Sequence, residues 1–254
     1  RWCEDAFHGP GAHLRVSPRG GVHFVSGCHA GIESRVLQGQ LFAVYVDGIV
    51  RRLPANALGS HLGAVGKNAA RFLSGMGAIL IAAADSQGTI HNPDGLDIGD
   101  LIELKEQGRS VVDYGDGEIS DCEGIIDIEC EIWIPAARPD VVNEQNVERM
   151  NTRLVVQGTN IPFTPGAELI LHQKGVLCIP DFIANAGGVI CAAMEYQGMS
   201  QTATLQVIEE KLRRNTELVL AESAANGILP REAAERMARK RIEKAMSVRR
   251  FNLF

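Results

Sequence analysis

The stretch SHLGAVGKNAARFL, residues 60–73, has the pattern of a glycine turn followed by a helix. Gly63 and Gly66 stand at its entrance, and the helical pattern over 66–77 ends at a glycine. A turn of this kind, between a buried strand and a helix, brings backbone N–H groups close to the pyrophosphate of a dinucleotide. The stretch therefore predicts the opening unit of a nucleotide-binding α/β fold.

One position departs from the full G-x-G-x-x-G pattern. His61 stands where the first glycine belongs, and we expect its β-carbon to crowd the tight turn. The residues before it, PANALGS (54–60), are poor strand formers, whereas a good strand, LFAVYV (41–46), ends well upstream. The turn therefore has two interpretations at this point: a cofactor site, or helix-entry glycines that pack closely on a strand.

Strand-like and helix-like runs alternate along the rest of the chain, as they do in a parallel sheet covered by helices. Besides LFAVYV, the predicted strands are AILIAAA (78–84), IECEIWIP (128–135), RLVVQG (153–158) and GVLCIP (175–180). The predicted helices lie at 66–77, at 164–175 with Thr164 as cap and Pro165 in the first position, at 202–226 and at 229–246. We expect a Rossmann-like, doubly wound, mostly parallel sheet with helices on both faces and long C-terminal helices.

A chain of 254 residues is long enough for one large α/β domain with additional segments. We divide it into an N-terminal lead-in segment (1–36), a Rossmann-like dinucleotide-binding domain (37–200) and a C-terminal helical segment (201–254).

Composition argues against several other classes of protein. The net charge of −6 and the scattered Lys and Arg residues leave no basic surface for nucleic acid. No apolar run reaches the ~18 residues of a membrane span, and the first residues lack the apolar core of a signal peptide. The six cysteines form no C-x-x-C pair and the histidines show no zinc spacing, so we expect reduced thiols, a cytoplasmic protein and no metal site.

Three polar residues directly follow predicted strands. Asp85 lies about 20 residues after Gly66, the spacing at which an acidic residue takes the ribose hydroxyls of a dinucleotide. Asn160 and Asn185 follow two further strands, at the sheet edge where open α/β folds bind ligands, and an Asn amide suits a carboxamide or a ribose hydroxyl. The alternative is that both Asn residues belong to ordinary turns.

Four blocks of sequence carry a resemblance to a known family. They resemble, in order, the cofactor domain of the glutamate/leucine/phenylalanine/valine dehydrogenases, and most closely that of bacterial glutamate dehydrogenases, with a similarity over roughly 17–246. The blocks are GTIHNPDGLDI (88–98), EIWIPAA (131–137), VVQGTNIPFTPGAE (155–168) and LCIPDFIANAGGVICAAMEY (177–196).

The resemblance implies a set of cofactor-binding residues. The segment Gly63, Ala64, Val65 and Gly66 matches the second half of the pyrophosphate turn, with Ala64 where an Asn is usual. Asp85, with the adjoining Ser86, matches the acidic position that binds the adenosine ribose and favours NAD over NADP, because a carboxylate repels a 2′-phosphate.

On the other side of the site, Ala136 and Ala137 match a main-chain segment beside the cofactor, and Asn160 and Asn185 match residues near the nicotinamide. The resemblance also supports LFAVYV as the strand that leads to the turn, which implies a long insertion between the two.

The reaction that the resemblance implies is the reversible, NAD-dependent oxidative deamination of an L-amino acid, glutamate first, to the 2-oxo acid and ammonia. The family's reactive lysine and aspartate lie in an N-terminal substrate domain, and none of the six lysines here lies in a matching motif, so we assign no catalytic residue. We expect the C-terminal part of a longer enzyme that forms a homo-oligomer, typically a hexamer in the family, and binds a small amino-acid substrate.

Two alternatives stay open. Ala192 stands where glutamate-specific members usually have a Ser that contacts the substrate carboxylate, so the enzyme could instead be a leucine, valine or phenylalanine dehydrogenase. A solitary cofactor domain without its substrate half would be a non-catalytic nucleotide-binding module.

Overall fold

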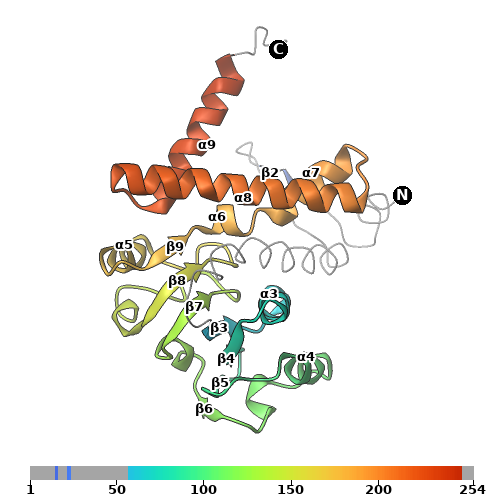
Figure 1. Cartoon of the computed structure of the whole chain (residues 1–254), viewed down its shortest axis with the longest axis vertical. Helices are drawn as coiled ribbons and strands as arrows, with labels where there is room; N and C mark the ends of the chain where they lie inside the picture. The colour runs from blue at the N-terminus through green and yellow to red at the C-terminus, as the bar shows by residue number, and fades with distance from the viewer. Residues whose placement is uncertain (1–14, 17–21, 24–56, 248–254) are drawn as a thin grey trace.

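The computed structural model describes residues 15–16, 22–23 and 57–247, and its core is one seven-stranded sheet (Figure 1). The strand order is β6-β5-β4-β3-β7-β8-β9, in which the strands from β4 to β9 run parallel and β5 and β6 run antiparallel at one edge. The strands are β3 (Ala57–His61), β4 (Ile79–Ala84), β5 (Thr89–His91), β6 (Glu118–Ser120), β7 (Cys130–Ile134), β8 (Thr152–Val156) and β9 (Leu177–Ile179), with a separate antiparallel pair, β1 (Arg15–Val16) and β2 (Val22–His23).

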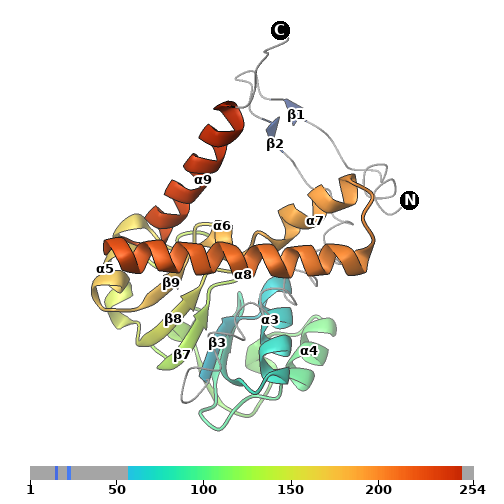
Figure 2. The ribbon, with the colours of Figure 1, turned by 45° about the horizontal axis from the view of Figure 1, so that its top comes forward.

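Helices cover both faces of the sheet. The α-helices are α3 (Ala64–Gly75), α4 (Ile98–Glu106), α5 (Pro165–Gln173), α6 (Asp181–Ala184), α7 (Gly187–Tyr196), α8 (Gln201–Asn226) and α9 (Pro230–Ser247), and single 3₁₀ turns lie at η1 (Val111–Asp113), η2 (Gly124–Ile126) and η3 (Val147–Arg149). One buried cluster joins α3, α8 and the start of α9 to the sheet, and a second joins α5, η2 and η3 to the opposite face. In Figures 1 and 2, α8 is the long helix that crosses the molecule, and α9 projects away from it.

This architecture confirms the predicted α/β class with its mostly parallel sheet. The predicted strands at 78–84, 128–135, 153–158 and 175–180 form β4, β7, β8 and β9, and the four predicted helices form α3, α5, α8 and α9. Thr164 caps α5 by accepting a hydrogen bond from the Ala167 N–H, and Pro165 takes the first helical position. Within the described residues, no helix combines the length and the apolar character that a membrane crossing requires.

The prediction that PANALGS is a poor strand was wrong. Ala57–His61 is β3, the central strand, which pairs with β4 and β7 and runs straight into Leu62 and Gly63. Its small residues have a packing reason: a β-carbon on Gly59 would lie 3.2 Å from Trp133 Cδ1 and 3.4 Å from Cys130 Sγ. LFAVYV lies outside the described residues, and the strand that enters the turn is β3, so no insertion separates strand from turn.

The order of the strands fixes where a ligand can bind. From β3 the chain moves outward to β4 on one side, and later returns to place β7 on the other side. The carboxyl ends of β3 and β7 therefore form the topological switch point, where loops diverge and leave a crevice. The predicted cofactor residues follow the strands on both sides of this point.

Candidate nucleotide-binding edge of the sheet

The glycine turn between β3 and α3 is tight and well bonded. The Leu62 N–H donates to the Ala84 carbonyl at 2.7 Å, the Gly63 N–H to the His61 carbonyl at 3.0 Å, and the Lys67 N–H to the Gly63 carbonyl at 2.9 Å. Among the described residues, no side chain caps α3, and its first turn carries no acidic residue. The first N–H groups of α3 therefore lie where an anion can satisfy them.

His61 closes β3 beneath the turn. Its side chain is 6% exposed, and its ring packs edge-on against Trp133, with ring centroids 5.5 Å apart. Leu62, the next residue, belongs to the opposite core cluster together with α3. The imidazole therefore lies in the core on the face away from α3, and the turn closes with histidine in place of the first glycine, contrary to the crowding expected from the sequence.

Burial also fixes the charge state of His61. Removal from water lowers the pKa of the imidazole to about 4, with a smaller contribution in the same direction from the charge of Arg138, while a backbone hydrogen bond at Ile134 acts in the opposite direction. The ring is therefore neutral at pH 7 and brings no charge to the turn above it.

Three segments converge beside the turn. A β-carbon on Gly63 would lie 3.5 Å from the Ala136 carbonyl, and one on Gly158 would lie 3.5 Å from both Val65 Cγ1 and Ala136 Cβ. The Gly158 N–H donates to the Pro135 carbonyl at 3.0 Å, which ties the end of β8 to the end of β7. The predicted residues Gly63, Val65 and Ala136 are thus neighbours, and Gly158 lies with them although the sequence did not single it out.

Asp85, at the end of β4, is surrounded by hydrogen-bond donors. Its Oδ2 accepts from Lys105 Nζ at 2.6 Å and from the Val111 N–H at 3.0 Å, and its Oδ1 accepts from Ser110 Oγ and the Gln87 N–H, each at 2.9 Å. Burial acts to raise the pKa of this carboxyl, but these bonds, Lys105 first, outweigh it and lower the pKa below its ordinary value. The group is therefore an anion that already has a cation beside it.

The remaining predicted residues lie around these two centres. Ser86, next to Asp85, and Ala137, next to Ala136, are exposed, and Gly66 is buried in the first turn of α3. Lys105 and Ser110 were not predicted, because a lysine in a helix and a serine before a 3₁₀ turn carry no distinctive signal in a single sequence.

Asn160 and Asn185 meet as their positions after β8 and β9 predicted. The Asn185 Nδ2 donates to the Asn160 Oδ1 at 2.7 Å, across 25 residues of sequence. With this bond made, the other polar atoms of the pair are Asn160 Nδ2, a donor, and Asn185 Oδ1, an acceptor. Asn160 is exposed and Asn185 is half-buried, so the pair lies at the surface of the sheet edge.

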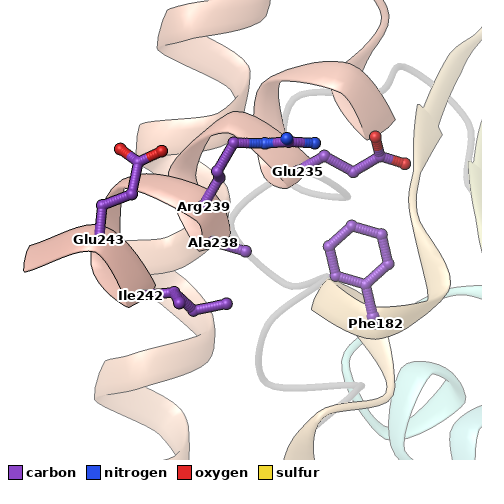
Figure 3. A pocket seen from close by; sticks show the side chains of 6 residues that line it. All are labelled: Phe182, Glu235, Ala238, Arg239, Ile242 and Glu243. Carbon is purple, nitrogen blue, oxygen red and sulfur yellow. The ribbon is translucent and has the colours of Figure 1, made fainter. Parts of the chain in front are cut away.

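A groove of about 490 Å³ lies elsewhere, between α6 and α9. Figure 3 shows Phe182 of α6 facing Ala238 and Ile242 of α9, with the charged side chains of α9 around them. None of its lining residues is a predicted cofactor residue. Across the described part of the chain, no group of three or more His, Cys, Asp or Glu residues is placed to hold a metal ion.

Comparison with known proteins identifies similar sequences over most of the described chain. The family model described as Glutamate/Leucine/Phenylalanine/Valine dehydrogenase matches residues 55–250. A glutamate dehydrogenase of Aeropyrum pernix is 34% identical over 198 residues, which cover 74% of this chain and 47% of that protein.

Two further relatives differ in the cofactor that their names state. An NADP-specific glutamate dehydrogenase of Saccharolobus shibatae is 38% identical over 134 residues, 53% of this chain and 32% of that protein. An NAD-specific glutamate dehydrogenase A of Halobacterium salinarum is 34% identical over 193 residues, 74% of this chain and 44% of that protein. The chain therefore spans about half, or less, of the length of these relatives.

The fold is similar to that of solved glutamate dehydrogenases. The structure of the hetero-hexameric enzyme of Thermus thermophilus in its Leu-bound form superposes with a TM-score of 0.75 at 22% identity, over 86% of this chain and 54% of that one. At this identity the likeness establishes the shared Rossmann-type architecture.

Proposed function

The chain belongs to the glutamate/leucine/phenylalanine/valine dehydrogenase family, and on this premise we propose that it forms the cofactor-binding part of an NAD-dependent L-glutamate dehydrogenase. The reaction is the reversible oxidative deamination of L-glutamate to 2-oxoglutarate and ammonia. The observation that carries the proposal is the convergence of Gly63, Ala136 and Gly158 at the switch point of the sheet.

In this proposal the turn from Gly63 to Gly66, with Ala64 and Val65 between, holds the pyrophosphate. The absence of a β-carbon at Gly63 leaves room beside the Ala136 carbonyl, and the first N–H groups of α3 supply hydrogen bonds and the positive end of the helix dipole. The neutral His61 lies beneath the turn and adds no charge to it. Val65 and Ala136 give an apolar contact next to the phosphate groups.

Asp85 is proposed to hold the adenosine ribose, with Ser86 beside it. A carboxylate accepts hydrogen bonds from ribose hydroxyls and repels a 2′-phosphate, which favours NAD. Lys105 offsets part of that repulsion, because its ammonium lies 2.6 Å from the same carboxylate. The relatives include enzymes of both cofactor specificities, so this preference rests on Asp85 and its neighbours.

Asn160 and Asn185 are proposed to meet the nicotinamide end, with Ala137 along the path between. The donor and the acceptor that remain on the Asn pair match the two polar atoms of a carboxamide. When bound there, the cofactor accepts the hydride that leaves the amino acid. The role of this chain is then to fix the ring in one orientation at the edge of the sheet.

Substrate binding and catalysis are assigned to a part outside this chain. Its span of 47% of the Aeropyrum pernix relative is consistent with that division. Ala192, exposed on α7, carries no hydroxyl for a substrate carboxylate, which is the observation that favours a leucine, valine or phenylalanine dehydrogenase as the second candidate. A cytoplasmic location, supported by the free thiols of the described cysteines, and assembly into a homo-oligomer belong to the same proposal.

Nucleotide titration of the 254-residue chain tests the proposal. We expect intrinsic Trp fluorescence to report saturable binding of NADH, and Gly63→Glu to abolish it because a carboxylate would occupy the anion site. Gly75→Glu is the matched control, since Gly75 lies at the other end of the same helix with nothing within 4 Å of an added β-carbon. Absence of binding at millimolar NADH, or equal loss in both variants, would contradict the proposal.

A further inference from the structure

The loop that carries Asn160 contains a residue in a disfavoured conformation. Ile161 has a φ of 50°, in the left-handed region that β-branched residues rarely adopt. Its side chain is 57% exposed, so burial of the side chain does not hold it there. Such a conformation persists only where the surroundings impose it, and it is common at functional sites.

Two hydrogen bonds hold the backbone of Ile161. Its N–H donates to Asp181 Oδ2 at 2.8 Å, and its carbonyl accepts from the Asp140 N–H at 2.9 Å. Asp181 also accepts, through its own carbonyl, the N–H of Asn185 at 2.7 Å. One residue at the start of α6 therefore contacts the chain at Ile161, next to Asn160, and at Asn185.

Asp181 is in turn fixed by Arg231 at the start of α9. The Arg231 Nη1 donates to Asp181 Oδ1 at 3.0 Å, its Nη2 to Gln157 Oε1 at 2.8 Å, and its Nε to Glu168 Oε2 at 2.5 Å. Gln157 and Glu168 are joined by their own 3.1 Å hydrogen bond. The planar guanidinium thus binds three buried side chains at once, which the compact ammonium of lysine cannot do.

The environment keeps Arg231 charged. Burial acts against the charged form, but Glu168 and Asp181 outweigh it and raise the pKa of the guanidinium above its ordinary value. The Phe182 ring lies under the guanidinium, 5.6 Å from its central carbon to the ring centroid. The cation is therefore permanent and fixed in direction.

We propose that Arg231 is a positioning residue: through Asp181 it imposes the left-handed conformation of Ile161 and so directs Asn160 toward the nicotinamide end of the cofactor. This inference rests on the proposed function. It assigns to α9, more than 65 residues after Asn160 in the sequence, control over the geometry of the hydride-accepting end.

The first test separates the two ends of the cofactor. NADH and ADP-ribose share the adenosine and pyrophosphate, but only NADH has the nicotinamide. We expect Arg231→Lys to weaken NADH binding about tenfold, an effect of the size of one lost polar contact, and to leave ADP-ribose binding unchanged. Arg239→Lys, an exposed arginine on the same helix, is the control. Equal weakening of both ligands by Arg231→Lys overturns the proposal.

The second test asks whether Arg231 acts through the strained residue. Glycine adopts a φ of 50° at no steric cost, so Ile161→Gly removes the need for an imposed conformation. We expect Arg231→Lys to weaken NADH binding by less than about threefold in the Ile161→Gly background, a non-additivity that shows coupling. A full tenfold loss in that background overturns the proposal, because a general structural role of Arg231 would not be rescued at position 161.

Amide exchange gives a readout that needs no nucleotide. We expect the Ile161 N–H to exchange faster in Arg231→Lys, while the Thr159 N–H, which donates to the Pro135 carbonyl at 2.9 Å, keeps its rate. If the wild-type chain binds neither NADH nor ADP-ribose, the proposed function fails, and the exchange rate of Ile161 still tests the contact through Asp181. An unchanged rate overturns the positioning role.

Discussion

Lys105 and Asp85, 20 residues apart in the sequence, form an ion pair in which the Lys105 Nζ and the Asp85 Oδ2 lie 2.6 Å apart at the end of β4. The pair is mostly buried, and it places a positive charge beside the carboxylate that is proposed to select NAD. The selectivity of the site therefore depends on both residues.

We expect Lys105→Met to raise the preference for NAD over NADP about fivefold, corresponding to ~1 kcal/mol for one partly screened charge. Without the ammonium, Asp85 repels a 2′-phosphate more strongly. The measurement is the ratio of the two dissociation constants. Lys67→Met is the control, because Lys67 pairs with Glu106 at 3.9 Å instead. An unchanged ratio in Lys105→Met would show that Lys105 plays no part in the choice.

The buried His61 predicts a specific dependence of stability on pH. The unfolded imidazole takes up a proton near its ordinary pKa of 6.5, but the folded one does so only near 4. This contribution to stability is therefore complete above pH 6.5 and is lost as the pH falls toward 4. Between about pH 7.5 and about pH 5 it lowers the free energy of unfolding by about 2 kcal/mol.

His61→Phe should remove that part of the pH dependence, because phenylalanine packs against Trp133 without titrating. Urea unfolding at the two pH values measures the change in each protein. His91→Gln is the control, since it leaves His61 in place. If wild type and His61→Phe lose the same stability on acidification, the buried imidazole is not responsible.

Restoring the glycine of the full dinucleotide pattern should not help binding. Because the His61 side chain lies in the core on the face away from α3, His61→Gly leaves a cavity beside Trp133. We expect it to lower the free energy of unfolding by about 2–4 kcal/mol and to change the NADH dissociation constant by less than about twofold. Tighter NADH binding would mean that His61 obstructs the turn.

A methyl group added at Gly59 should destabilise the central strand. Its β-carbon would lie 3.2 Å from Trp133 Cδ1, closer than ordinary packing allows. We expect Gly59→Ala to cost about 1–3 kcal/mol in the free energy of unfolding. Gly75→Ala, in an exposed part of α3, should instead stabilise by about 0.5–1 kcal/mol. Equal effects of the two variants would refute this account of why β3 contains small residues.

The sequence predicted those elements whose own residues carry the signal. The apolar runs of β4, β7, β8 and β9 and the amphipathic or capped helices α3, α5, α8 and α9 were found in this way. β3 was missed because Trp133, a residue of the neighbouring strand, determines its composition. β5 and β6 are only three residues long, and β6 is exposed along its whole length.

The same division holds at the candidate site. The meeting of Asn160 and Asn185 follows from strand order, because both residues come directly after strands that lie side by side. The pairing of Asp85 with Lys105, and of Asp181 with Arg231, depends on how a helix packs on the sheet. A single sequence gives no local pattern for such contacts, so these residues could be identified only in the folded chain.

The contacts of Arg231 also determine when this fold can be completed during synthesis. Glu168 and Asp181 are 3% and 5% exposed, and each is paired with Arg231. Until α9 has left the ribosome, both carboxylates lack their cation, and burying them would cost several kcal/mol. The edge of the sheet that carries Asn160 and Asn185 therefore assembles last, after nearly the whole chain has been translated.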